Sequence, residues 1–488
     1  MKTPNVRVKR RQGRQRLHAM LALLAFLPGC STINNATSSL LGTSGPAPGQ
    51  PGYVSGFLGG VVADEPRAAI AGREVLSSGG NAADAAVAIG LTLAVTLPSR
   101  AGLGGGGACL AYSPGRKSVN GGVPEAVMFV PPAPVRGGPA GDRPAAVPMM
   151  ARGLYLLNAR YGTQPFETRV GKAEELARFG VMVSKALAQD LRVVAQPLFT
   201  DPQAQAIFGP NGVPLAEGQT LIQPTLAATL SQIRFAGVGD MYSGNLAQRM
   251  AQASLVIGGP ISLDDLRNAL PRLTQPFFRD YRNDRIAFLP PPADGGLAAE
   301  AAFDYLVAHS GDVTGATQRS LAVIKRWRTG GPISPEALLA AQNLPPPPSS
   351  EFPASTSFLT FDPQGNAVAC ALTMNNLFGT GRIFPGTGVL AAASPDAVPP
   401  PLLAAGLIWN DNLKAFRAAA AASGQSAAPV SAAVELLSAL QTGRPMSVPP
   451  PEPGRANVIS CSQYLPGDKG SCGWAADPRS YGLALGSN

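Results

Sequence analysis

The chain has 488 residues, enough to bury a large core as one big domain or two ordinary ones. A hydrophobic fraction of 45% and a charged fraction of 14% are typical of a globular protein and exclude a disordered chain. The formal net charge is +9, but seven of the positive side chains lie within residues 2–16, before the first acidic residue. Without that segment the net charge is about +2, which excludes the basic surface of a nucleic-acid-binding protein.

Residues 1–30 have the pattern of an export signal. The basic segment is followed by an apolar run at 21–27, which is too short to span a bilayer as a stable helix. The run ends in Leu27-Pro28-Gly29-Cys30, which resembles the bacterial lipoprotein box, where the cysteine is lipidated and becomes the N-terminus. The alternative is an ordinary secretory signal cut nearby. We expect an exported, periplasmic protein, anchored to a bacterial membrane if Cys30 is lipidated, with residues 31–52 as a flexible tether.

Residues 80–107 predict a helix, a loop and a strand. Asn81 caps an apolar helix that begins at Ala82, and four consecutive glycines at 104–107 lead into a buried strand. No Lys, Ser or Thr follows these glycines at the spacing of a phosphate-binding loop. We interpret the glycine run as a tight packing turn.

Histidine is too scarce for two common kinds of site. The sequence has two histidines, and His18 lies in the export signal, so the exported chain keeps only His309. One histidine cannot build a His-rich metal site, and a Ser-His-Asp triad would depend on it. His309 follows the predicted helix 299–308, where a histidine interacts with the helix dipole at the surface. We therefore expect no metal site and no cofactor.

The cysteines fit an oxidising compartment. Cys461 and Cys472 flank the turn formers at 465–470, and we predict that they form a disulfide across that turn. Cys109 and Cys370 lie in small or apolar runs, where we expect inert core residues. The sequence has no CxxC pattern of a metal site.

Residues 355–375 predict a hairpin with a polar inward face. Turn formers at 362–366 separate two apolar, β-branched runs. If Phe361 and Ala367 close the turn as an antiparallel pair, Ser355 lies opposite Thr373, with Asn375 two residues beyond on the same face. A Ser hydroxyl, a Thr hydroxyl and an Asn amide then converge.

One chemistry uses such a set without histidine. Cleavage between Ala354 and Ser355 would free an α-amine with a pKa of about 8, which can act as general base to the hydroxyl of its own residue. The Thr and Asn side chains would orient the amine and the hydroxyl. The alternative is a polar strand face that only contacts water.

Short motifs along most of the chain occur in one order. They are GNAADAAVA and the glycine run (80–107), residues 160–191, LPPPADGGLAAEA (289–301), GNAVA (365–369), FGTG (378–381), PGTGVL (385–390) and ADPR (476–479). With them the chain resembles the gamma-glutamyltransferase family of N-terminal-nucleophile hydrolases over about residues 56–479. The resemblance implies an α+β fold, the four-layer αββα sandwich. It divides the chain into a large-subunit-like region, 53–354, and a small-subunit-like region, 355–488, that begins at the processing site.

The resemblance implies roles for five positions. Ser355 takes the place of the family's nucleophilic Thr, and Thr356 is the alternative at a one-residue slip. Thr373 and Asn375 match the family's neighbouring catalytic residues, and Thr356 matches a substrate-binding neighbour. Asp396, one residue out of register, is the nearest acid for the substrate amine.

Other family positions are changed. The Arg that binds the γ-glutamyl carboxylate has no counterpart in residues 127–135, and the next Arg is Arg136; an apolar side chain cannot replace a bidentate clamp. The family's paired serines fall on Pro401–Leu403, and its oxyanion glycine pair falls on residues 422–428, where Gly424 is the only glycine. Losing such a donor typically costs about 10²–10³ in rate.

Three functions fit these observations. The first is an exported gamma-glutamyltransferase-like enzyme that transfers or hydrolyses γ-glutamyl amides such as glutathione. The second is a divergent N-terminal-nucleophile amidase that uses serine on another, less charged acyl group. The third is a non-catalytic envelope lipoprotein that keeps the fold as a scaffold. Ser355, Thr373 and Asn375 favour the first two, whereas the lost Arg and glycine pair favour the second and third.

Overall fold

The structure, a computed structural model, describes residues 56–114, 120–135, 141–329, 333–341 and 354–487. All of them belong to the unit Val54–Asn488. The predicted export signal, the tether, Cys30 and Arg136 lie outside the described residues. Within the described ranges, no helix combines the length and the hydropathy needed to cross a membrane.

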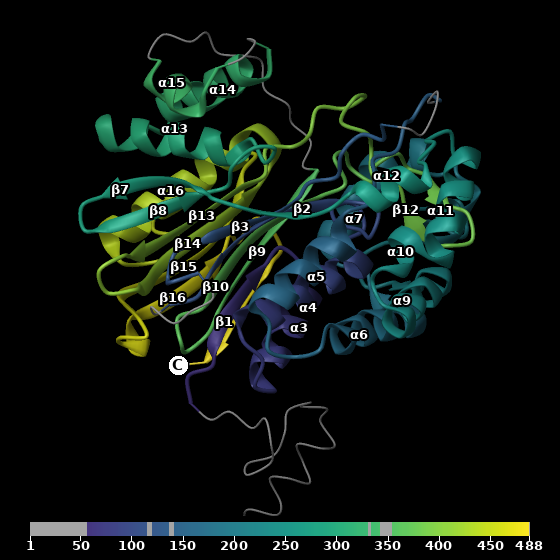
Figure 1. Cartoon of the computed structure of the whole chain (residues 1–488), viewed down its shortest axis with the longest axis horizontal. Helices are drawn as coiled ribbons and strands as arrows, with labels where there is room; N and C mark the ends of the chain where they lie inside the picture. Colours follow the sequence, from purple (N-terminus) through teal and green to yellow (C-terminus); the bar gives the residue numbers. More distant parts are fainter. Residues whose placement is uncertain (1–55, 115–119, 136–140, 330–332, 342–353, 488) are drawn as a thin grey trace, which may run out of the picture. The chain divides into compact units, whose positions relative to one another are not determined.

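Two antiparallel sheets form the centre of the fold (Figure 1). The first has seven strands in the order β17 (Leu483–Ser487), β1 (Gly59–Ala63), β9 (Ser355–Phe361), β10 (Ala367–Thr373), β2 (Gly106–Tyr112), β3 (Glu125–Phe129) and β6 (Arg272–Thr274). The second has six strands in the order β16 (Cys472–Ala476), β15 (Arg455–Leu465), β14 (Ala415–Ser423), β13 (Ala404–Asn410), β8 (Asp284–Phe288) and β7 (Phe277–Tyr281). Both predicted regions of the chain contribute strands to each sheet.

Helices cover the two outer faces of the paired sheets. Figure 1 shows α3 (Pro66–Ser77), α4 (Ala82–Thr96) and α5 (Met150–Tyr161) against the first sheet, and α13 (Gly295–Ala308) and α16 (Ala428–Thr442) against the second. The molecule is therefore the four-layer αββα sandwich that the sequence predicted.

The other elements are short or lie outside the sandwich. The helices are α6 (Phe166–Phe179), α7 (Lys185–Leu198), α8 (Pro202–Phe208), α9 (Pro224–Ala236), α10 (Asp240–Ser243), α11 (Asn245–Val256), α12 (Leu263–Asn268), α14 (Val313–Thr329) and α15 (Pro335–Ala340). Two-stranded ladders join β4 (Val181–Met182) to β5 (Thr220–Leu221) and β11 (Ile383–Phe384) to β12 (Val389–Leu390). Single 3₁₀ turns are η1 (Gln425–Ala427) and η2 (Lys469–Ser471).

Side-chain alternation explains why β9 is buried on both faces. Phe358 packs into the core beneath the helices, while Leu359 and Phe361 pack into the core between the two sheets. Helix α4 supplies much of the first core, because every one of its residues is buried. It begins as predicted at Asn81, whose side chain accepts the N–H of Asp84 in a capping box.

The hairpin of β9 and β10 has the register predicted from the sequence. Phe361 pairs with Ala367 and Ser355 pairs with Thr373. The carboxylate of Asp362 stabilises the turn by accepting the N–H groups of Gln364 and Asn366. Because the side-chain period of a strand is two, this register directs Ser355 and Thr373 toward the layer between the sheets.

The described residues form two cross-strand disulfides. Cys461 on β15 is bonded to Cys472 on β16. Cys109 on β2 and Cys370 on β10 are buried in the core, as expected, but they form a disulfide that the sequence did not predict. The strand pairing sets the two cysteines directly opposite each other, which the local sequence around either one does not indicate.

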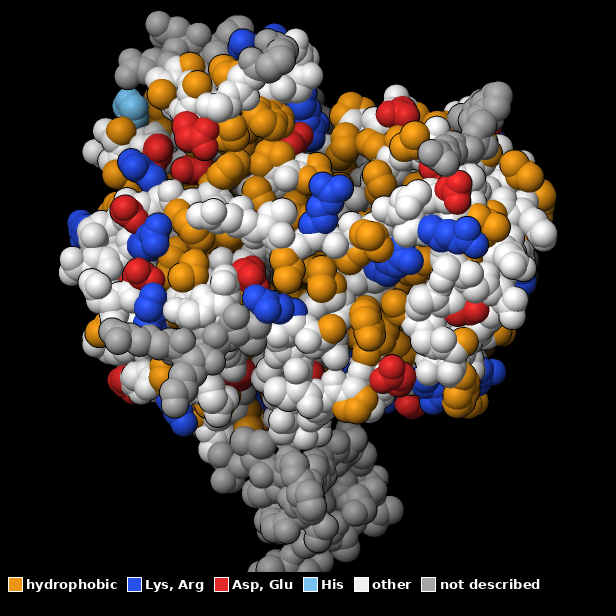
Figure 2. Space-filling view, viewed as in Figure 1, with side chains coloured by type: hydrophobic (Ala, Val, Ile, Leu, Met, Phe, Trp, Pro, Cys, Tyr) orange, Lys and Arg blue, Asp and Glu red, His pale blue; other side chains and the backbone are white. Residues whose placement is uncertain are grey.

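The surface carries charges of both signs. On the face shown in Figure 2, basic and acidic side chains are interspersed among polar and apolar ones. His309 is exposed after the end of α13, where its ring stacks on Tyr305 and its Nδ1 lies 3.0 Å from the carbonyl oxygen of that residue.

Candidate active site

The start of β9 and the end of β10 bring a hydroxyl pair to the same edge of the first sheet. The Thr373 hydroxyl donates a hydrogen bond of 2.8 Å to the carbonyl oxygen of Ala354. This carbonyl belongs to the peptide bond between Ala354 and Ser355. The Ser355 hydroxyl is buried and has no hydrogen-bond partner among the described residues. A polarised carbonyl and an uncommitted hydroxyl therefore flank the predicted processing bond.

Asn375 holds the Thr373 hydroxyl in place. The Asn375 N–H donates to Thr373 Oγ1 at 2.8 Å, and this backbone has a positive φ of 60°. The Asn375 side chain donates to the carbonyl oxygen of Ala393 at 2.9 Å and, at 3.4 Å, to that of Pro131. Thr373 thus accepts one hydrogen bond from Asn375 and donates one to Ala354. The three predicted residues Ser355, Thr373 and Asn375 lie together.

The glycine run allows strand β2 to approach this cluster closely. A Cβ atom on Gly105 would lie 2.3 Å from the carbonyl oxygen of Thr373. The Gly105 carbonyl in turn accepts the N–H groups of Met149 and Met150 at 2.8 and 2.9 Å. The run is therefore a packing turn, as the sequence predicted, and it lies beside the candidate site.

Thr356 and Asp396 do not join the cluster. Thr356 is buried, and its hydroxyl donates to Asp64 Oδ2 at 3.1 Å. Asp396 is exposed, and its N–H donates to the hydroxyl of Ser394 at 3.3 Å. Neither side chain hydrogen-bonds Ser355, Thr373 or Asn375 in the structure as described.

Asp64 lies beside the candidate site, and the sequence did not single it out. It follows β1 directly, is 1% exposed, and accepts hydrogen bonds from both sheets. Burial raises the pKa of its carboxyl, and the hydrogen bonds it accepts and the charge of Arg100 act against that rise. One signal could have found it: Asp64 is the first acidic residue of the chain and ends an apolar strand.

A strained turn lies at the end of β14, where the family has its oxyanion glycines. Gly424 has a φ of +107° and Gln425 a φ of +53°, and the chain then enters η1 and α16. A Cβ atom at Gly424 would lie 2.6 Å from the carbonyl oxygen of Pro453, so only glycine fits there. Backbone N–H groups before a helix N-terminus are suited to stabilising an oxyanion. We call residues 423–425 the oxyanion turn, after the role that the resemblance assigns to this position.

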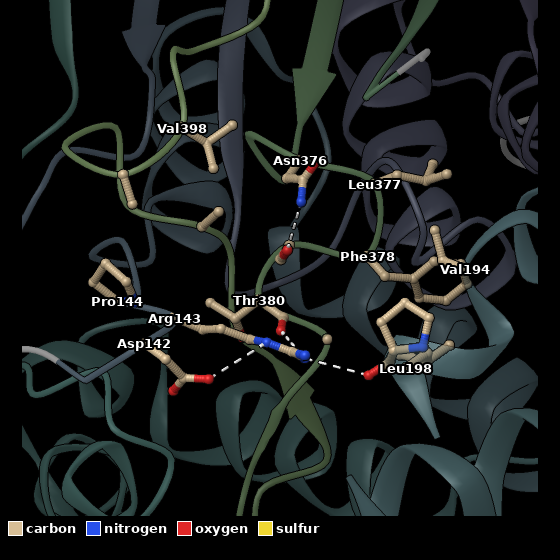
Figure 3. A pocket seen from close by; sticks show the side chains of 15 residues that line it. Asp142, Arg143, Pro144, Val194, Leu198, Asn376, Leu377, Phe378, Thr380 and Val398 are labelled. Atoms are coloured by element: carbon tan, nitrogen blue, oxygen red, sulfur yellow. Dashed lines mark hydrogen bonds and ion pairs between the residues drawn. The ribbon is translucent and has the colours of Figure 1, made fainter. Parts of the chain in front are cut away.

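An apolar pocket of about 360 Å³ adjoins the cluster (Figure 3). Ala393, whose carbonyl holds Asn375, and the next residue, Asn376, both line it. Much of the remaining lining is apolar and includes Val194, Leu198, Leu377, Phe378 and Val398. Ser355 itself is buried and is not among the residues that line the pocket.

Arg143 is the one basic residue in the lining of this pocket. It donates to the carbonyl oxygens of Pro197 and Thr380, each at 3.3 Å, and pairs with Asp142 at 3.8 Å. Asp142 is bound more tightly by Arg382, at 2.8 and 3.0 Å, which lowers the pKa of its carboxyl. The lining therefore contains one cation, which is already bonded to neighbouring groups, a few polar side chains and a larger apolar surface.

A second pocket, of about 200 Å³, adjoins the oxyanion turn. Three arginines line it, but each is paired with a carboxylate: Arg100 with Asp190, Arg455 with Glu452, and Arg479 with Asp477 and Glu452. The described residues contain no cluster of three His, Cys, Asp or Glu side chains that could hold a metal ion.

Comparison with known proteins bears on the fold and the family of the chain. The structure resembles the crystal structure of cephalosporin acylase from Bacillus halodurans, with a TM-score of 0.72 and 21% identity over 91% of this chain and 98% of that one. A glutathione hydrolase proenzyme of Escherichia coli (strain K12) is 29% identical over 374 residues, 65% of this chain and 63% of the relative. A glutathione hydrolase proenzyme of Bacillus subtilis (strain 168) is 32% identical over 253 residues, 49% of this chain and 43% of the relative.

The match to these curated relatives thus spans less than two thirds of their length. The family model of gamma-glutamyltranspeptidase matches residues 68–320, just over half of the chain. This stretch runs from α3 into α14 and includes the glycine run beside Thr373. The chain belongs to the gamma-glutamyltranspeptidase family.

Proposed function

We propose that the protein is an exported, self-processing amide hydrolase or acyltransferase that uses Ser355 as its N-terminal nucleophile. γ-Glutamyl amides such as glutathione are the substrates that family membership suggests. The observation that carries the proposal is the hydrogen bond of 2.8 Å from Thr373 to the carbonyl of Ala354, beside the uncommitted hydroxyl of Ser355. A donor on that oxygen withdraws electrons from the carbon that Ser355 would attack.

Processing would take two steps. In the first, Ser355 Oγ bonds to the carbonyl carbon of Ala354, the bond from this carbon to the Ser355 nitrogen breaks, and the hydroxyl proton ends on that nitrogen. In the second, water hydrolyses the resulting ester, which leaves a carboxylate on Ala354 and restores the hydroxyl of Ser355. Thr373 stabilises the negative charge that develops on the carbonyl oxygen. Asn375 keeps Thr373 aimed at that oxygen.

Turnover would then use the new α-amine. The amine accepts the hydroxyl proton of Ser355 as Oγ attacks the carbonyl of a substrate amide, and it returns a proton to the departing amine. Water or an acceptor amine then releases the acyl group from the serine ester. The amine has an ordinary pKa of about 8, so a neutral base is available near neutral pH without histidine.

A second candidate is the same chemistry on a less charged acyl group. The pocket beside Asn376 and Ala393 favours it, because its lining is largely apolar and its single cation, Arg143, is already bonded to two carbonyl oxygens. In addition, Val130 and Pro131 stand in the stretch where the family carries its carboxylate-binding Arg.

N-terminal sequencing of the purified protein, denatured and reduced, tests the proposal. We expect two chains, one of which begins at Ser355, and a single uncut chain for Ser355→Ala. Thr356→Ala is the matched control for the alternative that Thr356 is the nucleophile, and it should still be cut before Ser355. A wild-type protein that stays one uncut chain would contradict the proposal and leave the non-catalytic scaffold as the function.

A further inference from the structure

We propose that Asp64, as a carboxylate, is the positioning residue that holds the nucleophile strand β9 against the oxyanion turn. The role assigned to Ser355 rests on the proposed function, whereas the contacts of Asp64 do not. Asp64 directly follows β1, and its side chain accepts hydrogen bonds from the first sheet and from the second.

Two of its hydrogen bonds hold the residues that directly follow Ser355. Asp64 Oδ2 accepts the hydroxyl of Thr356 at 3.1 Å and the N–H of Ser357 at 2.8 Å. The Asp64 N–H also points to the carbonyl oxygen of Ser357, at 3.4 Å. The backbone immediately after the nucleophile is therefore attached to this one side chain.

Two other hydrogen bonds reach the second sheet. Asp64 Oδ2 accepts the hydroxyl of Ser423, the first residue of the oxyanion turn, at 3.2 Å. Asp64 Oδ1 accepts Asn457 Nδ2 on β15 at 2.9 Å, and the same amide donates to the carbonyl and hydroxyl oxygens of Ser357. One carboxylate thus joins β9, β14 and β15. It thereby holds the strand that begins at Ser355 at a set position relative to Ser423.

The donor set requires a carboxylate at this position. All four partners donate, three of them to Oδ2, and an ionised carboxylate only accepts. In Asp64→Asn, one side of the new amide would carry N–H groups that face donors. Rotating the Asn457 amide so that its oxygen accepts from the new N–H would also turn that oxygen toward the carbonyl oxygen of Ser357. At present the Asn457 nitrogen donates to this carbonyl. The amide variant therefore cannot satisfy every group.

Protonation of Asp64 would disturb the same contacts. Arg100, which pairs with Asp190, is the charged group that faces Asp64 from a neighbouring segment, and it favours the ionised form. Burial has the larger effect and raises the pKa of Asp64. Protonation would place an O–H where donors already converge, so the clamp should weaken as the pH falls through this raised pKa.

Global stability should respond with the opposite sign. A group whose pKa is raised by folding contributes stability that is present below its unfolded pKa and is lost as the pH rises through its folded pKa. The wild type should therefore lose melting temperature relative to Asp64→Asn as the pH rises through that range. If Asp64 had a merely structural role, its substitution would lower the melting temperature and the rate of cleavage together.

The test compares wild type, Asp64→Asn and Glu65→Gln. Glu65 is the matched control, because it is also buried with a raised pKa, but the hydrogen bonds that its side chain accepts among the described residues come from Thr96 and the N-terminus of α3. We expect Asp64→Asn to slow cleavage at Ser355 by about tenfold or more at neutral pH and to abolish the fall in rate toward acid pH. Glu65→Gln should keep the wild-type rate and pH profile. Equal rates and pH profiles for Asp64→Asn and wild type would overturn the inference.

Amide exchange separates this inference from the proposed function. In Asp64→Asn, the N–H of Ser357 should exchange about tenfold faster than in wild type, whether or not the chain is cut. If the wild type is never cut at Ser355, the proposed function fails, and the exchange rate still decides whether Asp64 clamps β9. If Asp64→Asn does not fold, Ser423→Ala removes only the contact to the oxyanion turn and should slow cleavage. An unchanged exchange rate in Asp64→Asn would overturn the clamp. If that variant does not fold, an unchanged cleavage rate in Ser423→Ala would overturn it.

Discussion

The hydroxyl of Thr373 lies 2.8 Å from the carbonyl oxygen of Ala354, across two strands joined by the turn at 362–366. The hydroxyl donates in this bond, and it accepts a hydrogen bond from the N–H of Asn375. The bond therefore links the predicted processing carbonyl to the backbone beyond β10. It leads to a direct test of how the chain would cut itself.

We predict that Thr373→Val slows cleavage at Ser355 by about 10²–10³, because the developing oxyanion loses a donor. Thr373→Ser keeps the hydroxyl and should process at close to the wild-type rate. Thr360→Val is the control, since Thr360 is a buried Thr on β9 whose hydroxyl bonds the carbonyl of Ala82, away from the site. The rates are measured by denaturing electrophoresis of freshly expressed protein. If Thr373→Val is cleaved at the wild-type rate, this hydrogen bond does not have the proposed role.

We predict that the Cys109–Cys370 disulfide joins the two products of cleavage. Cutting before Ser355 leaves Cys109 on one chain and Cys370 on the other, since the bond spans 261 residues of sequence. A non-reducing denaturing gel should show one species, and a reducing gel should show two. The pair Cys461→Ser and Cys472→Ser should leave this pattern unchanged, because both cysteines lie on the second chain. Two species from the cut protein without reductant would contradict the pairing.

We predict a preference for apolar over γ-glutamyl acyl groups in the mature protein. The comparison is kcat/KM for hexanoyl and γ-glutamyl p-nitroanilides, and the apolar lining of the pocket should favour the first. Val398→Phe would reduce the pocket volume and should lower kcat/KM for hexanoyl more than for acetyl p-nitroanilide. Leu413→Phe, at a residue that is 61% exposed, is the control and should change neither. A clear preference for the γ-glutamyl substrate would support the glutathione-like function instead.

We predict that the protein fractionates with membranes and that Cys30→Ser moves it to the soluble periplasm. The basis is the basic and apolar pattern of residues 2–27 that precedes Cys30. Ser31→Ala keeps the cysteine and should stay with the membrane fraction. Mass spectrometry that finds an unmodified N-terminus elsewhere would exclude the lipid and leave an ordinary secretory signal.

The hairpin shows how much of the site could be predicted from sequence. Its register follows from a five-residue turn and the two-residue period of a strand, so the positions of Ser355 and Thr373 were predictable from residues close to them. The Asn81 cap of α4 is equally local. The disulfide between Cys109 and Cys370 was not predicted for the opposite reason, because their pairing depends on β2 lying beside β10.

The sequence by itself determined the nucleophile candidate, its Thr and Asn neighbours and the scarcity of histidine, of which the chain has two. Only the tertiary structure decided that Thr356 bonds Asp64 instead of joining the cluster, and that Ser423 and Asn457 bond the same carboxylate. The reason is the range of the forces involved. Strand period, turn chemistry and caps act over a few residues, whereas Asp64 and Asn457 are 393 residues apart and meet only because two sheets pack face to face.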